Sequence, residues 1–245
     1  MQPSLDIAKL EKHFKDKLVF TSQDLLEFYA LTDKDITRST LYWRIFSLVK
    51  QGHIKRMGRG LFSLNEKLRF TPLVDKQLVK VNSLLKKKLP FAQFCLWNTK
   101  LINQWMLHQP FHFFTLVEVE KDALESVFHS LQDHYANVFL KPSGELIQRY
   151  TVGKPDVLIV LPLISEAPLQ NVGNVSTITL EKLIVDLFCE PDIFAAHQGS
   201  ELAFIYDNLF SKYSINLNRM MRYADRRKKK KALLNYLETN TNFRQ

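Results

Sequence analysis

One pair of histidines in the sequence has the spacing of a metal site. His108 and His112 stand four residues apart, as two ligands on one face of a helix would. Pro110 lies between them and breaks the helix that this spacing requires. We therefore expect no metal to be bound there.

Two dipeptides have the form of catalytic motifs, but each lacks its partners. Pro155-Asp156 begins an apolar strand as in metal-dependent nucleases, yet no acidic residue, spacer and lysine follow on an apolar strand downstream. Gly199-Ser200 is similar to the nucleotidyltransferase motif, which needs paired carboxylates about ten residues further on to hold Mg²⁺. Only the single Asp207 stands there.

No Walker loop, GxGxxG or GxSxG motif is present in the sequence, and neither cysteine has a histidine beside it. We expect no catalytic residues, no cofactor and a protein that is not an enzyme. One alternative is a nucleic-acid-processing enzyme with its active site in residues 90–245, delivered by a DNA-binding module. A third is a protein whose N-terminal module binds another protein.

Residues 37–51 combine a buried apolar stripe with side chains suited to nucleic acid. Leu41, Ile45, Leu48 and Val49 recur at helical spacing, so Ser39, Trp43, Phe46 and Lys50 should project outward. Thr40, Arg44 and Ser47 are expected on a flank of this helix, and Arg38 at its start, within reach of a guanine edge or a phosphate. For Trp43 and Phe46, burial against a neighbouring domain is an equal alternative.

A second group of basic residues follows around closely spaced glycines. Residues 53–57 and 60–64 alternate in polarity on either side of the turn Gly58-Arg59-Gly60, which predicts a two-stranded hairpin. The residues expected to contact DNA are Arg38, Ser39, Thr40, Trp43, Arg44, Lys50, Lys55, Arg56 and Arg59. For the hairpin residues the alternative is a solvated charged turn.

The elements that carry these residues define the expected fold. Helices near residues 5–14, 24–30 and 37–51, followed by the hairpin, predict a winged helix-turn-helix over residues 1–70. Residues 71–89 are expected to form a linker helix. Residues 90–245 predict an α/β domain with strands at 94–97, 111–119 and 156–161 and a polar loop at 165–176. Helices are expected near 99–107, 122–134, 179–188, 201–213, 216–223 and 229–237, so the fold class is α+β with a helical C-terminal tail.

The length of the chain is consistent with two domains, and its net charge favours a polyanionic partner. The 245 residues carry 34 Lys and Arg against 25 Asp and Glu, a formal net charge of +9. Residues 1–70 hold 13 basic and 8 acidic residues, so 13 − 8 = +5 of this excess lies in the expected DNA-binding domain. No apolar stretch approaches 20 residues, the N-terminus carries charges where a signal peptide is apolar, and two cysteines cannot form a disulfide framework. We expect a cytoplasmic protein that does not span a membrane.

A basic run near the C-terminus stands apart from the rest of the charge. Residues 226–231, here called the basic run, place charge around a whole helical turn, so they should be largely exposed. The run contacts nucleic acid or an acidic surface, or it is a solvated helix junction. The surface expected to act on a partner comprises Arg222, Arg226, Arg227, Lys228, Lys229, Lys230 and Lys231.

Three segments together resemble one known family. LVKQGHIKR at residues 48–56 with RGLF at 59–62 resembles the N-terminal winged helix of AbiEi-type antitoxins and transcriptional regulators of bacterial abortive-infection (type IV toxin–antitoxin) systems. ITLEKLIVDL at 178–187 is similar to the family's Glu-Lys-x3-Asp helix, and residues 216–237 to its closing segment. The resemblance implies an autorepressor that binds double-stranded DNA of its own promoter. It also implies an antitoxin that counteracts a nucleotidyltransferase-like toxin, by contacting the toxin or its RNA or protein target.

Within that helix, Glu181 and Asp186 are expected to be structural. Five residues apart, they point about 140° away from each other, too far to share a proton or a metal. Glu181 should favour the positive end of its helix, and Asp186 should pair with a neighbouring helix.

Overall fold

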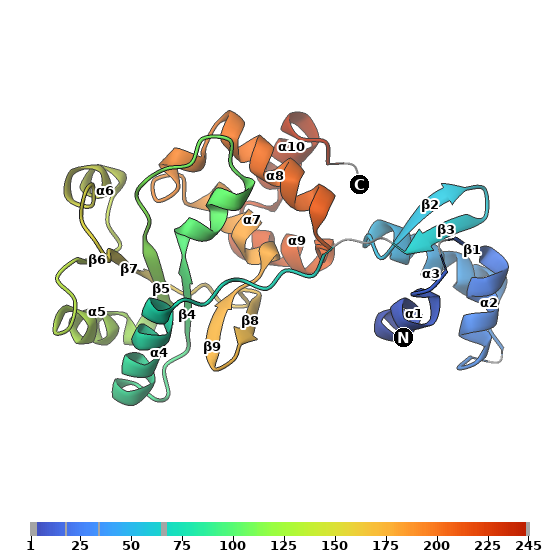
Figure 1. Cartoon of the computed structure of the whole chain (residues 1–245), viewed down its shortest axis with the longest axis horizontal. Coiled ribbons are helices and arrows are strands. Elements are labelled where there is room, and N and C mark those ends of the chain that lie inside the picture. The colour runs from blue at the N-terminus through green and yellow to red at the C-terminus, as the bar shows by residue number, and fades with distance from the viewer. Residues whose placement is uncertain (1–3, 18, 34, 65–67, 244–245) are drawn as a thin grey trace. The chain divides into compact units, whose positions relative to one another are not determined.

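The structure is a computed structural model that describes residues 4–17, 19–33, 35–64 and 68–243. The chain divides into two compact units (Figure 1). The described residues up to Arg69, together with Ser211–Asn216, form the first unit. The second unit comprises Phe70–Phe210 and the described residues from Leu217 onward. The fold class is therefore mixed α+β, with helices and a small sheet in the first unit and a larger sheet with further helices in the second.

The first unit contains three helices and a three-stranded antiparallel sheet of order β1-β3-β2. Its elements are α1 (Ile7–Phe14), β1 (Phe20–Thr21), α2 (Ser22–Ala30), α3 (Arg38–Lys50), β2 (Ile54–Gly58) and β3 (Leu61–Leu64). Buried side chains of all three helices and of each strand form one core, in which Phe14 stacks on Phe20 with ring centroids 4.1 Å apart. The three helices and the hairpin expected here are thus present.

Threonine side chains begin the second and third helices. Thr21 caps α2 by accepting a hydrogen bond from the Asp24 amide at 3.1 Å, while the Asp24 carboxylate accepts one from the Thr21 amide at 2.7 Å. Thr37 caps α3 by accepting from the Thr40 amide at 3.2 Å. Gly60, with a φ of 71°, makes the hairpin turn in a conformation that favours glycine.

The segment Ser211–Asn216 belongs to the first unit although it follows the second unit's sheet in the chain. Leu68 bridges Tyr213 in parallel, donating from its amide to the Lys212 carbonyl at 2.9 Å and accepting from the Ser214 amide at 3.1 Å. The first unit is therefore discontinuous, which the division at residue 70 did not anticipate.

A four-stranded mixed sheet of order β4-β5-β7-β6 organises the second unit. Strand β4 (Phe94–Asn98) is antiparallel to β5 (Thr115–Val119), whereas β5, β7 (Leu158–Pro162) and β6 (Val138–Leu140) are parallel. The carboxyl ends of these three parallel strands therefore meet at one edge of the sheet.

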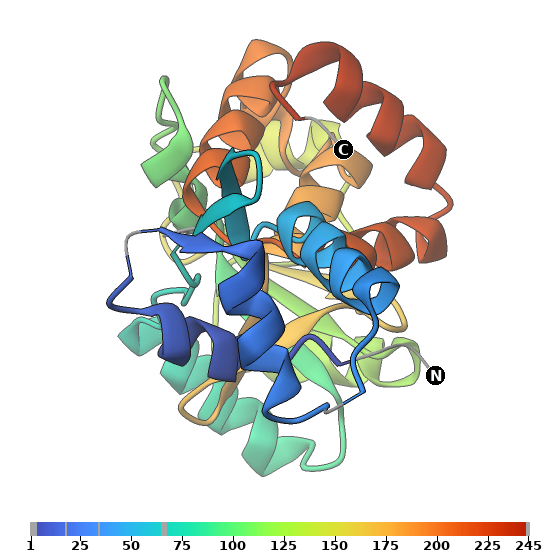
Figure 2. The same cartoon turned by 90° about the vertical axis from the view of Figure 1, so that its right-hand side faces the viewer.

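The two faces of this sheet are covered differently. Helices α4 (Lys76–Lys88) and α5 (Leu124–Gln132) pack on the face formed by alternate residues such as Phe94 and Val117. The predicted linker helix is thus present as α4, but its apolar side is part of the second unit's core. Opposite lie Trp97 and Glu118, toward α7 (Leu180–Cys189). Helices α8 (Ser200–Lys212), α9 (Leu217–Arg226) and α10 (Lys230–Asn240), orange to red in Figure 2, complete the unit.

Several predicted boundaries and one predicted loop are wrong. The strand expected at 111–119 begins only at Thr115, and the helix expected at 99–107 is a 3-10 helix, Thr99–Trp105. The expected polar loop at 165–176 contains the hairpin of β8 (Leu169–Val172) and β9 (Val175–Ile178). Strand β6 and helix α6 (Gly144–Tyr150) were not anticipated. Among the described residues, no helix is both long and apolar enough to cross a membrane.

Candidate functional site

Helix α3 presents one continuous exposed face in the first unit. At 100° per residue its exposed side chains fall within an arc of about 140° centred near Phe46. This surface, called the α3 face, comprises Arg38, Ser39, Tyr42, Trp43, Phe46 and Lys50. Tyr42, Trp43 and Phe46 are 64%, 36% and 63% exposed.

The predicted exposure of Arg44 is wrong. Its position on α3 is about 170° from the centre of the α3 face, so it points inward. The guanidinium donates to Asp33 at 3.1 Å and lies 4.4 Å from the centroid of the Tyr29 ring. Only 5% of Arg44 is exposed, so this residue holds α3 against the preceding helix and loop.

The hydroxyl groups at the start of α3 already have partners. Thr37 Oγ1 lies 2.9 Å from the Ser39 hydroxyl and 2.9 Å from the Thr40 hydroxyl. Ser39 is exposed while Thr40 is half-buried. Of these two predicted DNA contacts, Ser39 is the better placed.

The hairpin carries three exposed basic residues beside the apolar residues that anchor it. Lys55, Arg56 and Arg59 are exposed, as predicted, and the Arg56 guanidinium lies 5.6 Å from the centroid of the buried Phe62 ring. On α3, the Lys50 ammonium lies 5.8 Å from the Phe46 ring. The aromatic side chains of this unit are thus bordered by cations.

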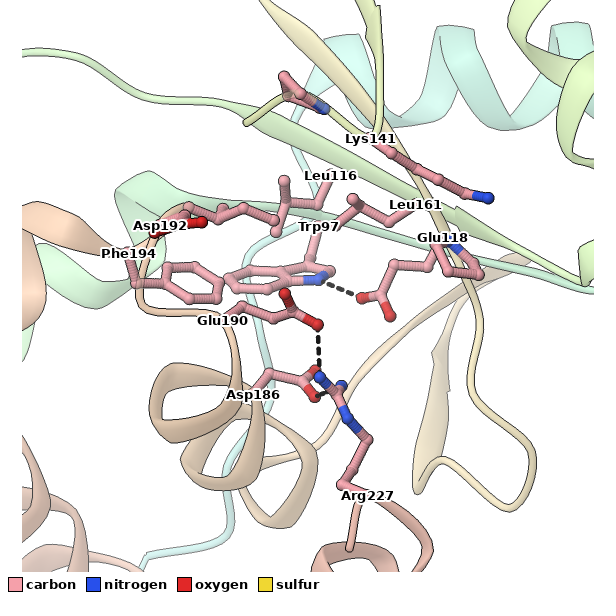
Figure 3. A pocket seen from close by; sticks show the side chains of 13 residues that line it. Trp97, Leu116, Glu118, Lys141, Leu161, Asp186, Glu190, Asp192, Phe194 and Arg227 are labelled. Atoms are coloured by element: carbon pink, nitrogen blue, oxygen red, sulfur yellow. Dashed lines mark hydrogen bonds and ion pairs between the residues drawn. The ribbon is translucent and has the colours of Figure 1, made fainter. Parts of the chain in front are cut away.

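A pocket of about 290 Å³ lies at the carboxyl edge of the second unit's parallel strands (Figure 3). Glu118 and Leu161 stand near the ends of β5 and β7, and Lys141 follows β6. In open α/β sheets, ligands bind at this edge. Lys141 has a φ of 43°, which is unusual for a residue with a side chain. Trp97 and Phe194, stacked with centroids 5.9 Å apart, form an aromatic wall.

Beneath the pocket, a buried lysine joins two carboxylates from different elements. Lys182 of α7 donates to both oxygens of Glu118, at 2.7 and 2.5 Å, and to Asp186 one turn further along its own helix. Trp97 Nε1 donates to Glu118 at 2.9 Å. The Lys182 side chain is 0% exposed, so its charge is compensated only by these groups of the protein.

Arg227, directly after α9, extends this network, and its predicted exposure is wrong. Its guanidinium donates to Asp186 at 3.0 Å and to Glu190, and only 13% of its side chain is exposed. Tyr223 also donates to Asp186, at 2.9 Å. The expectation that Asp186 pairs with a neighbouring helix is confirmed. The set of Glu118, Lys182, Asp186, Arg227 and Glu190 is called the buried ion network.

The charges of the buried ion network do not balance. Three carboxylates face two cations, which leaves a formal charge of 2 − 3 = −1. Burial raises the pKa of Glu118, although Lys182 opposes this shift. Burial disfavours the charged form of Lys182, but Asp186 and Glu118 outweigh it and hold the lysine pKa well above its usual value. The lysine is therefore the fixed positive charge of the network.

The rest of the basic run is exposed, as predicted. Lys228, Lys229, Lys230 and Lys231 are all exposed, between α9 and the first turn of α10. Arg222 and Arg226 are also exposed and approach Glu166 at 3.8 and 3.1 Å. The lysines therefore form a compact cationic surface on the second unit.

The sequence carries signals of the buried ion network that belong to no catalytic motif. Glu118 interrupts an apolar strand, and Lys182 lies among apolar residues of α7. A charged residue inside a fully buried element needs a partner of opposite charge. Of the motif residues considered first, His108 contacts the carboxylate of Glu201 at 2.6 Å. Among the described residues, no three His, Cys, Asp or Glu side chains gather as a metal site.

Comparison with protein-family models assigns the chain to a family. The model of a family described as a family of unknown function (DUF6577) matches residues 40–243. No curated protein matches the chain. The matched region begins within α3 and includes the hairpin, the pocket and the basic run.

Proposed function

Because the chain belongs to the DUF6577 family, whose function is unknown, we propose its function from its geometry: a DNA-binding transcriptional autorepressor. In this proposal the first unit is a winged helix-turn-helix, with α3 as the recognition helix and the β2–β3 hairpin as the wing. The second unit acts as an antitoxin that counteracts a nucleotidyltransferase-like toxin.

The observation that carries this proposal is the α3 face. A recognition helix needs a set of exposed side chains on one side, while its other side is fixed in a core. Six exposed residues within about 140° satisfy the first requirement. Buried Leu41, Ile45 and Leu48, with Arg44 paired to Asp33, satisfy the second.

Charge on the hairpin supports the same function. Lys55, Arg56 and Arg59 give the proposed wing three exposed cations for phosphate contacts. Phosphate contacts set the position of a protein on DNA, whereas side chains of a helix in the major groove read the bases. The first unit offers both kinds of group.

Antitoxin activity of the second unit rests on a resemblance and on one surface. ITLEKLIVDL at 178–187 resembles the AbiEi-type motif, and its Lys182 and Asp186 are buried and paired. These two residues of the motif therefore have a structural role, and contact with a partner must be made by other residues. The exposed lysines 228–231 are the surface we assign to contact with an acidic protein or RNA.

A catalytic role for residues 90–245 is the competing function, and the pocket is the observation in its favour. Its position at the carboxyl edge of parallel strands is typical of ligand sites. However, Glu118 and Asp186 both accept hydrogen bonds from Lys182, and Asp186 and Glu190 accept from Arg227. Carboxylates engaged in this way act as counter-ions of the protein, which favours the binding function.

The proposal is tested by titrating the whole protein against the duplex upstream of its own reading frame. Binding should weaken steeply with salt because phosphate contacts release counterions, and preference over a scrambled duplex should persist. Absence of binding at low salt would refute the repressor function. Divalent-metal-dependent cleavage or modification of RNA by the protein would support the enzyme instead.

A further inference from the structure

We propose that the α3 face reads thymine methyl groups in the major groove, so that the target DNA is rich in thymine at the contacted positions. This inference rests on the proposed function and specifies its substrate class. It assigns the base reading to Tyr42 and Phe46 at the centre of the face, with Trp43 at its edge.

Along the helix, the middle of the α3 face carries aromatic rings, whereas the hydroxyl of Ser39 lies in the first turn. Tyr42 and Phe46 are the most exposed of its aromatic residues, at 64% and 63%, and are one helical turn apart on the same side. Arg38 lies at one end of the helix and Lys50 at the other. A helix lying in a groove with this face inward presents rings to the middle of its site and cations to the two ends.

The chemistry of the major groove selects one base for such a surface. Thymine alone presents a methyl group there, and apolar side chains, including phenylalanine, contact it. Adenine is usually read by Asn or Gln and guanine by Arg or Lys. The face contains no Asn or Gln, and its Arg38 and Lys50 are at the ends. Thymine is therefore the base that the middle of the face can distinguish.

Charge complementarity favours DNA over a second copy of the chain as the occupant of this face. Arg38 and Lys50 are the charged members of the face, and both are positive. The hairpin adds exposed Lys55, Arg56 and Arg59. Two copies meeting through this face would bring cations toward cations, whereas the phosphates that line a major groove would neutralise them.

The experiment removes single methyl groups from the DNA. In the upstream duplex bound by the full-length protein, each thymine is replaced in turn by uracil, which pairs identically but lacks the methyl. At contacted positions we expect affinity to fall about fourfold, which is the effect expected for one buried methyl group. Uracil at other positions should have no effect.

Protein variants link this effect to the named residues. In Phe46→Ala and Tyr42→Ala, uracil and thymine should bind equally well at the positions that the ring contacts. Leu31→Ala is the matched control, because Leu31 is an exposed apolar residue of the same unit outside the α3 face, at 75% exposure. This variant should retain the discrimination of the native protein.

The possible results separate the inference from the proposed function. Specific binding with no uracil effect at any position would overturn thymine reading and leave the repressor function standing. No DNA binding by the native protein would refute the function itself. If Phe46→Ala instead dissociates a dimer and leaves uracil discrimination unchanged, the face is an interface between copies and the inference is wrong.

Discussion

Replacing Lys182 by methionine tests whether the buried ion network holds the second unit together. Methionine has nearly the length of lysine but no charge, so Lys182→Met removes the ammonium while keeping most of the packing. Glu118 then keeps only the Trp97 N–H among its hydrogen bonds described above. The formal charge of the network falls from −1 to −2, and the two carboxylates that lose the lysine, Glu118 and Asp186, are both buried.

The expected loss follows from the cost of leaving a buried charge uncompensated. Removing one partner of a buried ion pair costs about 3–5 kcal/mol of the free energy of unfolding. For a unit of this size, each kcal/mol shifts the melting temperature by about 2–4 °C. We therefore expect melting of the second unit to fall by roughly 6–20 °C.

Urea unfolding measures this change if the signal comes from the second unit. Trp97 and Trp105 belong to that unit, so a Trp43→Phe background removes the tryptophan of the first unit. The matched control is Lys141→Met, the same substitution at an exposed lysine of the same pocket. It should change stability by no more than about 0.5 kcal/mol.

A double variant tests the electrostatic origin of the loss. Glu118→Gln combined with Lys182→Met returns the network to −1 and keeps an oxygen for the Trp97 donor. Most of the stability should return. Three results would refute the reasoning. Lys182→Met could lose less than about 1 kcal/mol of the free energy of unfolding, or Lys141→Met could lose as much as Lys182→Met. The double variant could also be no more stable than Lys182→Met alone.

Four other predictions concern the DNA-contacting side chains, the basic run, the buried residue His197 of the second unit, and Arg44. Arg38→Ala should lower the free energy of DNA binding by about 1–3 kcal/mol and relax base specificity. Arg59→Ala should weaken binding to all sequences equally and reduce the slope of log affinity against log salt concentration by about 1. Mobility-shift titrations measure both effects. Alanine at residues 228–231 should reduce rescue of cells from the neighbouring toxin, with thermal stability within about 0.5 kcal/mol of native; undiminished rescue would remove this surface from the mechanism. Burial lowers the pKa of His197 from 6.5 to about 4, so the second unit should lose up to about 3 kcal/mol as pH falls from 6.5 through 4, and urea titrations of His197→Gln should lack this loss. Arg44→Ala should cost about 1–2 kcal/mol of the free energy of unfolding of the first unit and so lower its melting temperature. An unchanged melting temperature would contradict the structural role of Arg44.

Local signals in the sequence were sufficient for the helices and the hairpin of the first unit. The cap at Thr37, the apolar stripe of α3 and the glycines of the hairpin act over a few residues, so each element follows from its own segment. Arg44 was misplaced because its inward side chain is stabilised by Asp33 and Tyr29, which lie outside α3. An arginine near a helix surface carries no local sign of such partners.

The second unit was harder to predict because its site depends on distant pairings. Lys182 meets a carboxylate 64 residues earlier in the chain, and Arg227 meets Asp186 41 residues earlier. Spacing within one segment cannot indicate such contacts. The hairpin of β8 and β9 was missed for a different reason: both strands have only four residues, and the polar residues among them resemble a loop.

Because Leu68 bridges Tyr213, the first unit cannot finish folding until late in synthesis of the chain. The 216 − 69 = 147 residues from Arg69 to Asn216 must be translated before the returning segment is available. At about 5–20 residues per second, this takes roughly 7–30 s, far longer than helix and hairpin formation. The helices and hairpin emerge early, but the backbone of Leu68 has no partner for most of translation. Ribosomes stalled shortly before and shortly after residue 216 has left the exit tunnel should therefore carry first units that differ in resistance to protease.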